Sequence, residues 1–336
     1  MPNNVSKVLV TGGAGYVGCV LVPKLLGAGH EVIVYDLMFF GGDGLPTHDR
    51  LQVIEADIRD TDSLAKALAG VDQVIHLACI SNDTRFELDP GLGKSINYDC
   101  FEPMVKAAKA AGVKRFIYAS TSSVYGVSDA PEVREDHPLV PLTDYNKFKG
   151  MCEPLLLRHQ SPDFTTVVIR PATVCGYSPR MRFDLTVNIL TNHAVNKGKI
   201  TVFGGRQQRP NIHVDDIADL YVKLLEYPSE LIAGEIFNAG YQNHTVSELA
   251  DMVKKVVEDE MPERAPINIE TTASDDLRSY HVSSTKIAEK LGYQPERSVE
   301  DAVRDLCKAL KAGKLPNSLE DDRYINVRYL KKGGVG

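Results

Sequence analysis

The chain has 336 residues, of which 43% are hydrophobic, and a formal net charge of −7. This length suits one large domain or two closely associated lobes with a sizeable buried core. The acidic residues are scattered and no basic stripe occurs, which argues against a nucleic-acid surface, so we expect a small-molecule partner.

The six cysteines and nine histidines form no metal or disulfide pattern. The cysteines lie at irregular intervals without a CxxC pair, and the histidines lack spacings such as HExxH, so we predict reduced thiols and no metal. No apolar run approaches the roughly 20 residues that span a bilayer, and no signal-type segment precedes the first strand. We therefore expect a cytoplasmic protein without a membrane partner.

The first half of the chain alternates short β-branched runs with helical stretches. Strands that are apolar throughout are typical of a parallel sheet covered by helices on both faces. We predict a doubly wound α/β fold of the Rossmann type over residues 1–170, to which the chain returns near 211–240. Residues 171–315 are predicted to form a smaller, interleaved C-terminal α/β lobe for the substrate, and 316–336 a loosely held tail.

A glycine-rich turn, "VLVTGGAGYVG", lies between the first strand and the first helix and contains Gly12, Gly15 and Gly18. Glycines there permit a tight turn, close helix packing and close approach of a pyrophosphate to backbone amides. Tyr16 and Val17 belong to the same turn and are expected to border the ligand. A purely structural turn is the alternative, which the position after the first strand disfavours.

The second strand ends at Asp36, about twenty residues beyond the glycine turn. A carboxylate there accepts hydrogen bonds from the ribose hydroxyls of adenosine and would repel a 2′-phosphate. No Arg or Lys follows it, so NAD is favoured over NADP as the cofactor of the domain formed by residues 1–170. Further cofactor contacts are expected at two later strand ends, from Asp57, Ile58, Leu77 and Ala78.

Hydroxyl and phenol groups follow in two later segments. "YASTSSVYG" ends the fifth strand, where hydroxyls face the ligand crevice, although such a cluster also commonly satisfies backbone groups in a turn. In "DYNKFKG", Tyr145 and Lys149 are four residues apart and lie on one helical face, whereas Lys147 is predicted to be solvated. An adjacent ammonium favours the phenolate, which makes Tyr145 a candidate base.

Together the TGGxGxxG spacing, Asp36, "ADIRD", "HLAC", "STSSVYG" and the YxxxK pair resemble the extended short-chain dehydrogenase/reductase superfamily. The resemblance is strongest to its NAD-dependent nucleotide-sugar epimerase and dehydratase branch, typified by UDP-galactose 4-epimerase, and covers roughly residues 6 to 310. It implies a two-lobed enzyme that holds NAD tightly and binds a nucleotide sugar, with a UDP-sugar favoured. It also implies that Thr121 and Tyr145 are catalytic and that Lys149 tunes Tyr145 and holds the nicotinamide ribose.

The same resemblance suggests substrate contacts in the second lobe. Arg209, before the "IHV" element, matches a diphosphate-binding arginine, and Asn188 matches an amide that meets the substrate. Two positions depart from the pattern: Thr173 replaces an asparagine and Ala273 an arginine, for which Arg278 is a candidate substitute. Further candidates, for either the sugar or base site or for packing between lobes, are Phe39, Phe40, Met181, Arg182 and Phe183.

Ser122 and Ser123 occupy positions where the dehydratases and decarboxylases of this branch carry an acidic residue. Without a second carboxylate, elimination or decarboxylation is disfavoured. We therefore predict a nucleotide-sugar 4-epimerase that oxidises its substrate transiently to a 4-keto sugar. The resemblance also implies a homodimer paired through helices, with the helices at "CFEPMVKAAKAAG" and after Tyr145 as the candidates. The alternatives are a 4-keto sugar nucleotide reductase or dehydrogenase using NAD(P), and a non-catalytic NAD-sensing scaffold.

Overall fold

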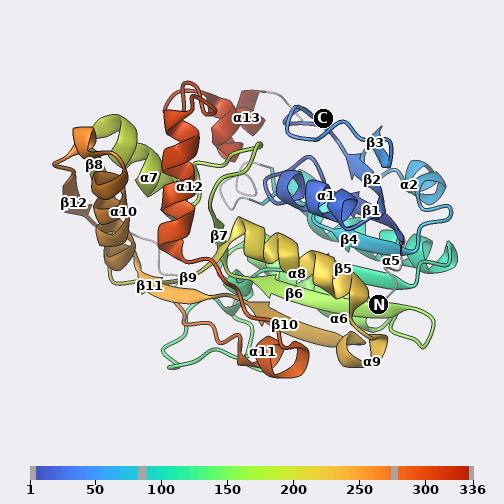
Figure 1. Cartoon of the computed structure of the whole chain (residues 1–336). Coiled ribbons are helices and arrows are strands. Elements are labelled where there is room, and N and C mark those ends of the chain that lie inside the picture. The colour runs from blue at the N-terminus through green and yellow to red at the C-terminus, as the bar shows by residue number, and fades with distance from the viewer. Residues whose placement is uncertain (1–4, 82–88, 274–278, 333–336) are drawn as a thin grey trace.

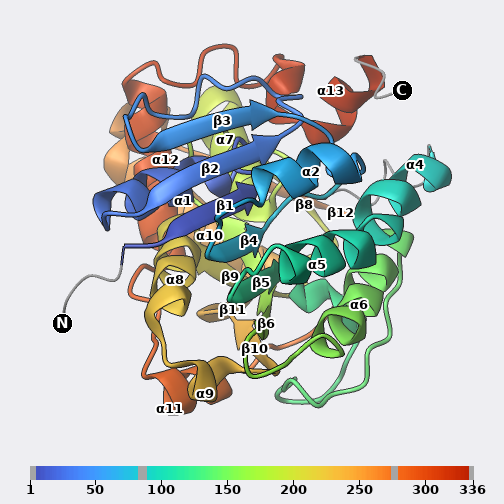
Figure 2. The same ribbon diagram turned by 90° about the vertical axis from the view of Figure 1, so that its right-hand side faces the viewer.

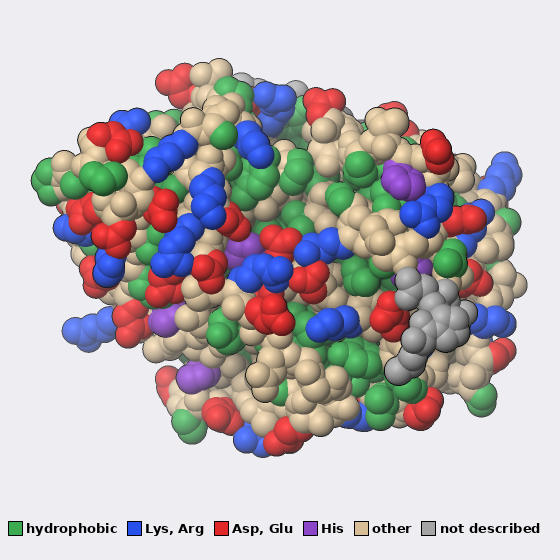
Figure 3. Space-filling view, viewed as in Figure 1, with side chains coloured by type: hydrophobic (Ala, Val, Ile, Leu, Met, Phe, Trp, Pro, Cys, Tyr) green, Lys and Arg blue, Asp and Glu red, His purple; other side chains and the backbone are tan. Residues whose placement is uncertain are grey.

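The structure of the chain, a computed structural model, describes residues 5–81, 89–273 and 279–332, with side chains up to Tyr329 (Figure 1). Arg278 therefore lies outside the described residues. No helix in these ranges is long and apolar enough to cross a membrane. On the face shown in Figure 3, acidic and basic side chains are interspersed.

A seven-stranded sheet, all of whose strand pairs are parallel, forms the centre of the molecule. In spatial order its strands are β10 (Glu235–Ala239), β6 (Thr165–Pro171), β5 (Arg115–Ala119), β4 (Gln73–His76), β1 (Lys7–Thr11), β2 (Glu31–Asp36) and β3 (Leu51–Glu55). The order reverses direction between β1 and β4, which is the switch point where doubly wound folds bind ligands. The predicted Rossmann-type fold is confirmed.

Helices cover both faces of the sheet because successive strand residues point to opposite sides. Val8 and Val10 pack into one apolar cluster and Leu9 into another. The first face carries α1 (Gly18–Gly27), α8 (Val214–Glu226), α9 (Ser229–Ile232) and α11 (Thr285–Leu291). The second face, toward the viewer in Figure 2, carries α2 (Thr61–Ala67), α5 (Phe101–Ala110) and α6 (Asp144–Leu157), with α4 (Pro90–Lys94) and the π-helix η1 (Ser95–Asp99) beside them.

The smaller lobe has its own apolar cluster, formed largely by three helices (Figure 1). Its helices are α7 (Thr186–Lys197), α10 (Val246–Glu260) and α12 (Val299–Lys311), and its two-stranded sheet contains β8 (Lys199–Phe203) and β12 (Asn268–Thr272). A three-stranded sheet of β7 (Thr173–Cys175), β9 (Gln208–His213) and β11 (Gln242–Thr245) connects the lobes. Short 3-10 turns are η2 (Ser122–Tyr125), η3 (Pro262–Arg264) and η4 (Asp322–Tyr324).

The C-terminal segment differs from the predicted loose tail. Tyr324 is 9% exposed and packs its ring on Phe183, and the Phe183 amide donates to the Tyr324 carbonyl at 2.7 Å. Helix α13 (Asn326–Lys332) follows directly and places Tyr329 against Phe39 and Phe40. Buried aromatic contacts hold this segment onto both lobes, and such contacts leave no periodic pattern in the sequence.

Candidate active site

A cavity of about 1090 Å³ lies beyond the carboxyl ends of the central strands and is lined from both lobes. It brings together most of the residues singled out in the sequence: Gly12, Gly15, Tyr16, Val17, Gly18, Asp36, Asp57, Ile58, Leu77, Ala78, Thr121, Tyr145, Lys149, Thr173 and Arg209. The residues that line the cavity extend from the glycine turn to the N-terminal turn of α7. These positions are far apart in sequence and meet only because the strand ends converge.

The glycine turn has the geometry of a diphosphate cradle. Gly12 has a φ of +73°, and a Cβ there would lie 2.6 Å from the Ala78 nitrogen. A Cβ on Gly18 would lie 2.4 Å from the Gly13 carbonyl oxygen, so the helix packs directly on the turn. Helix α1 starts beside the cavity with Val17 at its N-cap, which contributes no side-chain hydrogen bond. Its first N–H groups and the positive end of its dipole thus fit an anion.

Asp36 is fixed at the end of β2 by two backbone donors. Its Oδ2 accepts from the Ala14 amide at 3.0 Å and its Oδ1 from the Met38 amide at 2.9 Å. Burial raises the pKa of Asp36, although both amides and the charge of Arg180 oppose that rise. The remaining lone pairs suit the two hydroxyls of a ribose, so the cradle and this carboxylate fit a dinucleotide.

Arg180 reaches this region from the substrate lobe, which the sequence did not indicate. Its guanidinium lies 3.6 Å from the centre of the Phe40 ring and donates to Asn326 Oδ1 at 2.5 Å. Burial lowers the pKa of Arg180 to about 9. No cation follows Asp36 in sequence, yet the fold supplies one from a distant segment.

Helix α6 carries Tyr145 and Lys149 into the cavity. Thr143 caps the helix by accepting the Asn146 amide at 3.3 Å, so Tyr145 lies in the first turn. Lys149 is buried, donates to the Ala119 carbonyl at 2.6 Å and lies 4.9 Å from the centre of the Tyr118 ring. Lys147 is exposed, as its helical position predicts.

Thr121 presents its hydroxyl from the loop after β5. Its Oγ1 accepts from the Ser123 amide at 3.2 Å and lies 2.8 Å from Ser123 Oγ, which in turn donates to Asn146 Oδ1 at 2.5 Å. Because the single Ser123 proton goes to Asn146, Thr121 acts as the donor in the hydroxyl pair. The hydroxyl chain connects the strand end to the helix of Tyr145, and neither Ser123 nor Asn146 had been predicted to take part.

A buried ion pair supports this strand end from behind. Glu153 and Arg170 are 2% and 3% exposed and lie 2.6 Å apart between Oε2 and Nη2. Glu153 Oε1 also accepts from Ser120 Oγ at 2.5 Å, and Arg170 donates to the Tyr125 hydroxyl at 2.7 Å. The pair thus ties α6 and β6 to the residues that flank Thr121.

The segment after β7 alternates between core and cavity. Met181 and Phe183 are each 1% exposed and belong to an apolar cluster with the C-terminal segment, which favours the packing alternative for both. Arg182, between them, lines the cavity and forms an ion pair with Asp184 at 2.9 Å. Phe39 and Phe40 also line the cavity.

The structure does not bring Asn188, predicted to contact substrate, to the cavity. Asn188 is fully buried and is not part of the cavity lining. Its Oδ1 accepts the Gly176 amide at 3.0 Å, and its Nδ2 donates to the Tyr16 hydroxyl at 3.1 Å and to the Arg182 carbonyl at 3.0 Å. These bonds use both amide protons, so Asn188 positions the cavity wall instead.

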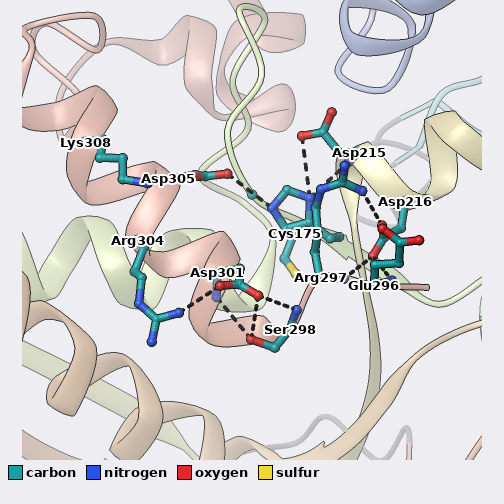
Figure 4. Close-up of polar contacts among 12 residues, drawn as sticks. Cys175, Asp215, Asp216, Glu296, Arg297, Ser298, Asp301, Arg304, Asp305 and Lys308 are labelled. Atoms are coloured by element: carbon teal, nitrogen blue, oxygen red, sulfur yellow. Dashed lines mark hydrogen bonds and ion pairs between the residues drawn. The ribbon is translucent and has the colours of Figure 1, made fainter.

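One group of potential metal ligands occurs among the described residues, outside the cavity: His213, Asp215 and Asp305, with ligand atoms within 4.8 Å of one another. His213 Nδ1 accepts the Asp215 amide at 3.1 Å and its Nε2 lies 3.6 Å from Asp305. Each carboxylate also contacts a lysine, Lys24 and Lys308 respectively, and Figure 4 shows Asp215 and Asp305 within this charged network. With these counter-charges present, the group acts as a polar connection between β9, α8 and α12.

A glycine cradle, a strand-end carboxylate suited to a ribose and a Tyr/Lys helix facing one cavity define a dinucleotide-dependent enzyme of the extended short-chain dehydrogenase/reductase type. The chain belongs to the NAD dependent epimerase/dehydratase family, whose pattern it matches over residues 8–240. It is accordingly NAD-dependent, as the sequence predicted.

Relatives of known activity differ in the reaction they catalyse. The chain is 27% identical over 335 residues to a UDP-glucose 4-epimerase of Lactobacillus helveticus, covering 94% of this chain and 99% of the relative. It is 30% identical over 311 residues to UDP-glucuronic acid decarboxylase 1 of Arabidopsis thaliana, covering 88% and 68%. Family membership alone therefore leaves the reaction open.

The fold matches solved structures over nearly its whole length. A UDP-glucose 4-epimerase of Thermotoga maritima, solved with UDP-glucose, superposes with a TM-score of 0.79 at 25% identity, covering 91% of this chain and 99% of that one. A dTDP-glucose 4,6-dehydratase of Streptomyces venezuelae, solved with NAD bound, gives a TM-score of 0.80 at 25% identity, covering 92% and 98%. The two-lobed arrangement is common to both enzymes.

Proposed function

We propose that the protein is a nucleotide-sugar 4-epimerase. The observation that carries the proposal is the meeting of Thr121, Tyr145 and Lys149 in one cavity with the dinucleotide cradle, while positions 122 and 123 hold serines. NAD, when bound, supplies a hydride acceptor that can return the hydride to the other face of the sugar ring. The protein's own residues then have to move one proton and hold the sugar.

Tyr145 is the proposed base for that proton. It removes the proton from the 4-hydroxyl of the sugar and gives it back when the ketone is reduced again. The ammonium of Lys149, one helical turn away, favours the phenolate. Thr121 orients the same hydroxyl, and the guanidinium of Arg209, which lines the cavity, suits the substrate diphosphate.

The positions that would distinguish a dehydratase or decarboxylase favour epimerisation. Ser122 is 1% exposed, and Ser123 is occupied by Thr121 and Asn146. Asp184 does bring a carboxylate into the cavity lining, but both its oxygens accept from Arg182, at 2.9 and 3.1 Å. A carboxylate held in this way is a poor acid or base for a neighbouring carbon.

A net reductase or dehydrogenase is the second candidate, because Thr173 lines the cavity at a position where the resemblance to the epimerases implies an asparagine. The two candidates differ in cofactor balance. An epimerase turns over without net oxidation or reduction of NAD, whereas a reductase consumes added NADH in proportion to product. We further propose a UDP-sugar substrate, a cytoplasmic location and a homodimer.

The test is turnover of the NAD-loaded protein on UDP-, GDP-, CDP- and dTDP-sugars, with products separated by chromatography. We expect one sugar nucleotide to be converted to its 4-epimer without net NADH consumption, and Tyr145→Phe to abolish conversion while NAD stays bound. Tyr241→Phe is the matched control, since that ring is 46% exposed. Wild-type turnover by Tyr145→Phe would refute the proposal.

A further inference from the structure

Arg182 is held rigidly at the wall of the cavity. The buried side chains of Met181 and Phe183 anchor its backbone in the apolar cluster, and Asn188 Nδ2 donates to its carbonyl at 3.0 Å. Between these two buried neighbours, the side chain of Arg182 lines the cavity. It is 12% exposed, so its charge is only weakly screened.

The guanidinium connects the two lobes in one orientation. Its Nε and Nη2 donate to Asp184 at 2.9 and 3.1 Å, while its Nη1 donates to Ser81 Oγ at 2.9 Å. The end of the guanidinium away from Asp184 therefore faces the loop after β4. The two-point pairing with Asp184 fixes the plane of the guanidinium.

The loop after β4 also contributes to the apolar cluster on which Tyr145 packs. The side chain of Ile80 forms an apolar cluster with Phe148, and Tyr145 packs against that cluster. Asn97 holds Ile80 on both sides, accepting from its amide at 2.8 Å and donating to its carbonyl at 2.9 Å. Tyr145 thus packs against the cluster that contains Ile80, and the Nη1 end of Arg182 bonds to Ser81, the next residue along the chain.

The charges around Arg182 agree with this geometry. Burial lowers the pKa of Arg182, but the charge and hydrogen bonds of Asp184, followed by the ionised forms of Tyr145 and Cys79, outweigh burial and leave the pKa raised. Attraction between two groups acts on both, so a cation stabilised by a phenolate also stabilises the phenolate. The other titratable or charged groups facing the pair are Lys149 of α6, Tyr118 of β5, Cys79 after β4, Tyr16 of the glycine turn, and Arg180 and Asp184 of the substrate lobe.

We propose that Arg182 is a positioning residue that stabilises the phenolate of Tyr145 as a second cation beside Lys149. This inference rests on the proposed role of Tyr145 as the base. Because Arg182 comes from the substrate lobe, the phenolate of Tyr145 has both cations near it only when the two lobes are packed together.

The phenolate of Tyr145 can be titrated without any turnover. The NAD-loaded protein, labelled with carbon-13 at the ring carbon bearing the hydroxyl of tyrosine, is titrated by NMR, and Tyr145→Phe identifies the signal among the 14 tyrosines. We expect Arg182→Met to move the midpoint of that signal up by about one pH unit, which is about tenfold less phenolate at neutral pH. Arg304→Met, whose side chain is 43% exposed, is the control and should leave the midpoint unchanged.

Two further variants separate charge from folding. Arg182→Lys keeps the charge and should restore at least half of the shift, whereas Asp184→Asn removes the opposing carboxylate and should move the midpoint down. An unchanged midpoint in folded Arg182→Met, or equal midpoints for the Met and Lys variants, would overturn the inference. If Arg182→Met does not fold, as judged by circular dichroism, the direction of the Asp184→Asn shift decides. Absence of epimerase activity on every sugar would instead count against the proposed function and leave this titration valid.

Discussion

The buried pair of Glu153 and Arg170 permits a sharp test of how the strand end is held. Glu153 accepts three hydrogen bonds, two from Arg170 at 3.0 and 2.6 Å and one from Ser120 at 2.5 Å. Glu153→Gln keeps the shape of the side chain but removes the charge and places an amide donor near the guanidinium. The guanidinium is then buried without a counter-charge.

The expected destabilisation follows from burial. Removing one partner of a buried ion pair lowers the free energy of unfolding by about 3 to 5 kcal/mol, because the remaining charge stays away from water. Both side chains are at most 3% exposed, so we expect at least about 3 kcal/mol for Glu153→Gln. Replacing both partners, as Glu153→Met with Arg170→Met, should destabilise by less than the sum of the two single changes, with a coupling of about 2 kcal/mol.

Urea unfolding followed by far-ultraviolet circular dichroism measures these differences, since the chain has no tryptophan. Asp259→Asn is the control, because it breaks an ion pair with Lys255 in which the side chains are 63% and 76% exposed. That change should alter the free energy of unfolding by no more than about 0.5 kcal/mol. A Glu153→Gln effect as small as the control, or strictly additive single changes, would show that the pair does not behave as a buried unit.

Three further predictions concern the cofactor end of the cavity, each read by calorimetric titration with NAD. Gly12→Ala should abolish NAD binding, because its Cβ would lie 2.6 Å from a backbone nitrogen. The control Gly27→Ala, whose Cβ meets nothing within 4 Å, should bind NAD like the wild type. Equal affinities of the two variants would contradict the cradle geometry. Asp36→Asn should weaken NAD binding at least about tenfold, because charge-assisted hydrogen bonds are lost. An unchanged affinity would exclude this carboxylate from the ribose site. Tyr329→Ala removes the ring stacked 5.4 Å from Phe40 and should weaken binding by up to about tenfold; unaltered binding would show that α13 is not part of the cofactor wall.

The Rossmann half of the molecule is predictable from sequence because its signals are local. An apolar strand, a glycine turn and a helix follow one another within a few residues, and the carboxylate at Asp36 lies at the next strand end. Parallel pairing then forces the strand ends to one edge of the sheet. The spacing of Tyr145 and Lys149 places both on one helical face, whereas the choice of Thr121 within its hydroxyl cluster came from the resemblance to the family.

The substrate side depends on contacts that no local pattern encodes. Arg180 reaches the region of Asp36 from the other lobe, and the segment 325–328 lines the cavity although it reads as a tail. Asn97, which clamps the loop after β4, lies in a π-helix turn that periodicity does not reveal. These residues are positioned by tertiary packing, and only the assembled fold shows what they touch.

Asn188 and Arg182 show how a motif position can support the cavity wall without lining the cavity itself. Asn188 begins α7 as the family pattern implies, but its amide is used entirely inside the wall, and one of its bonds fixes the backbone of Arg182. The group that lines the cavity is therefore Arg182, whose backbone the amide supports. Relatives of this chain include epimerases and decarboxylases, so the fold alone does not set the reaction. The Arg182 and Asp184 pair is a charged part of the cavity wall contributed by the substrate lobe, and the titration described above tests whether that pair acts on Tyr145.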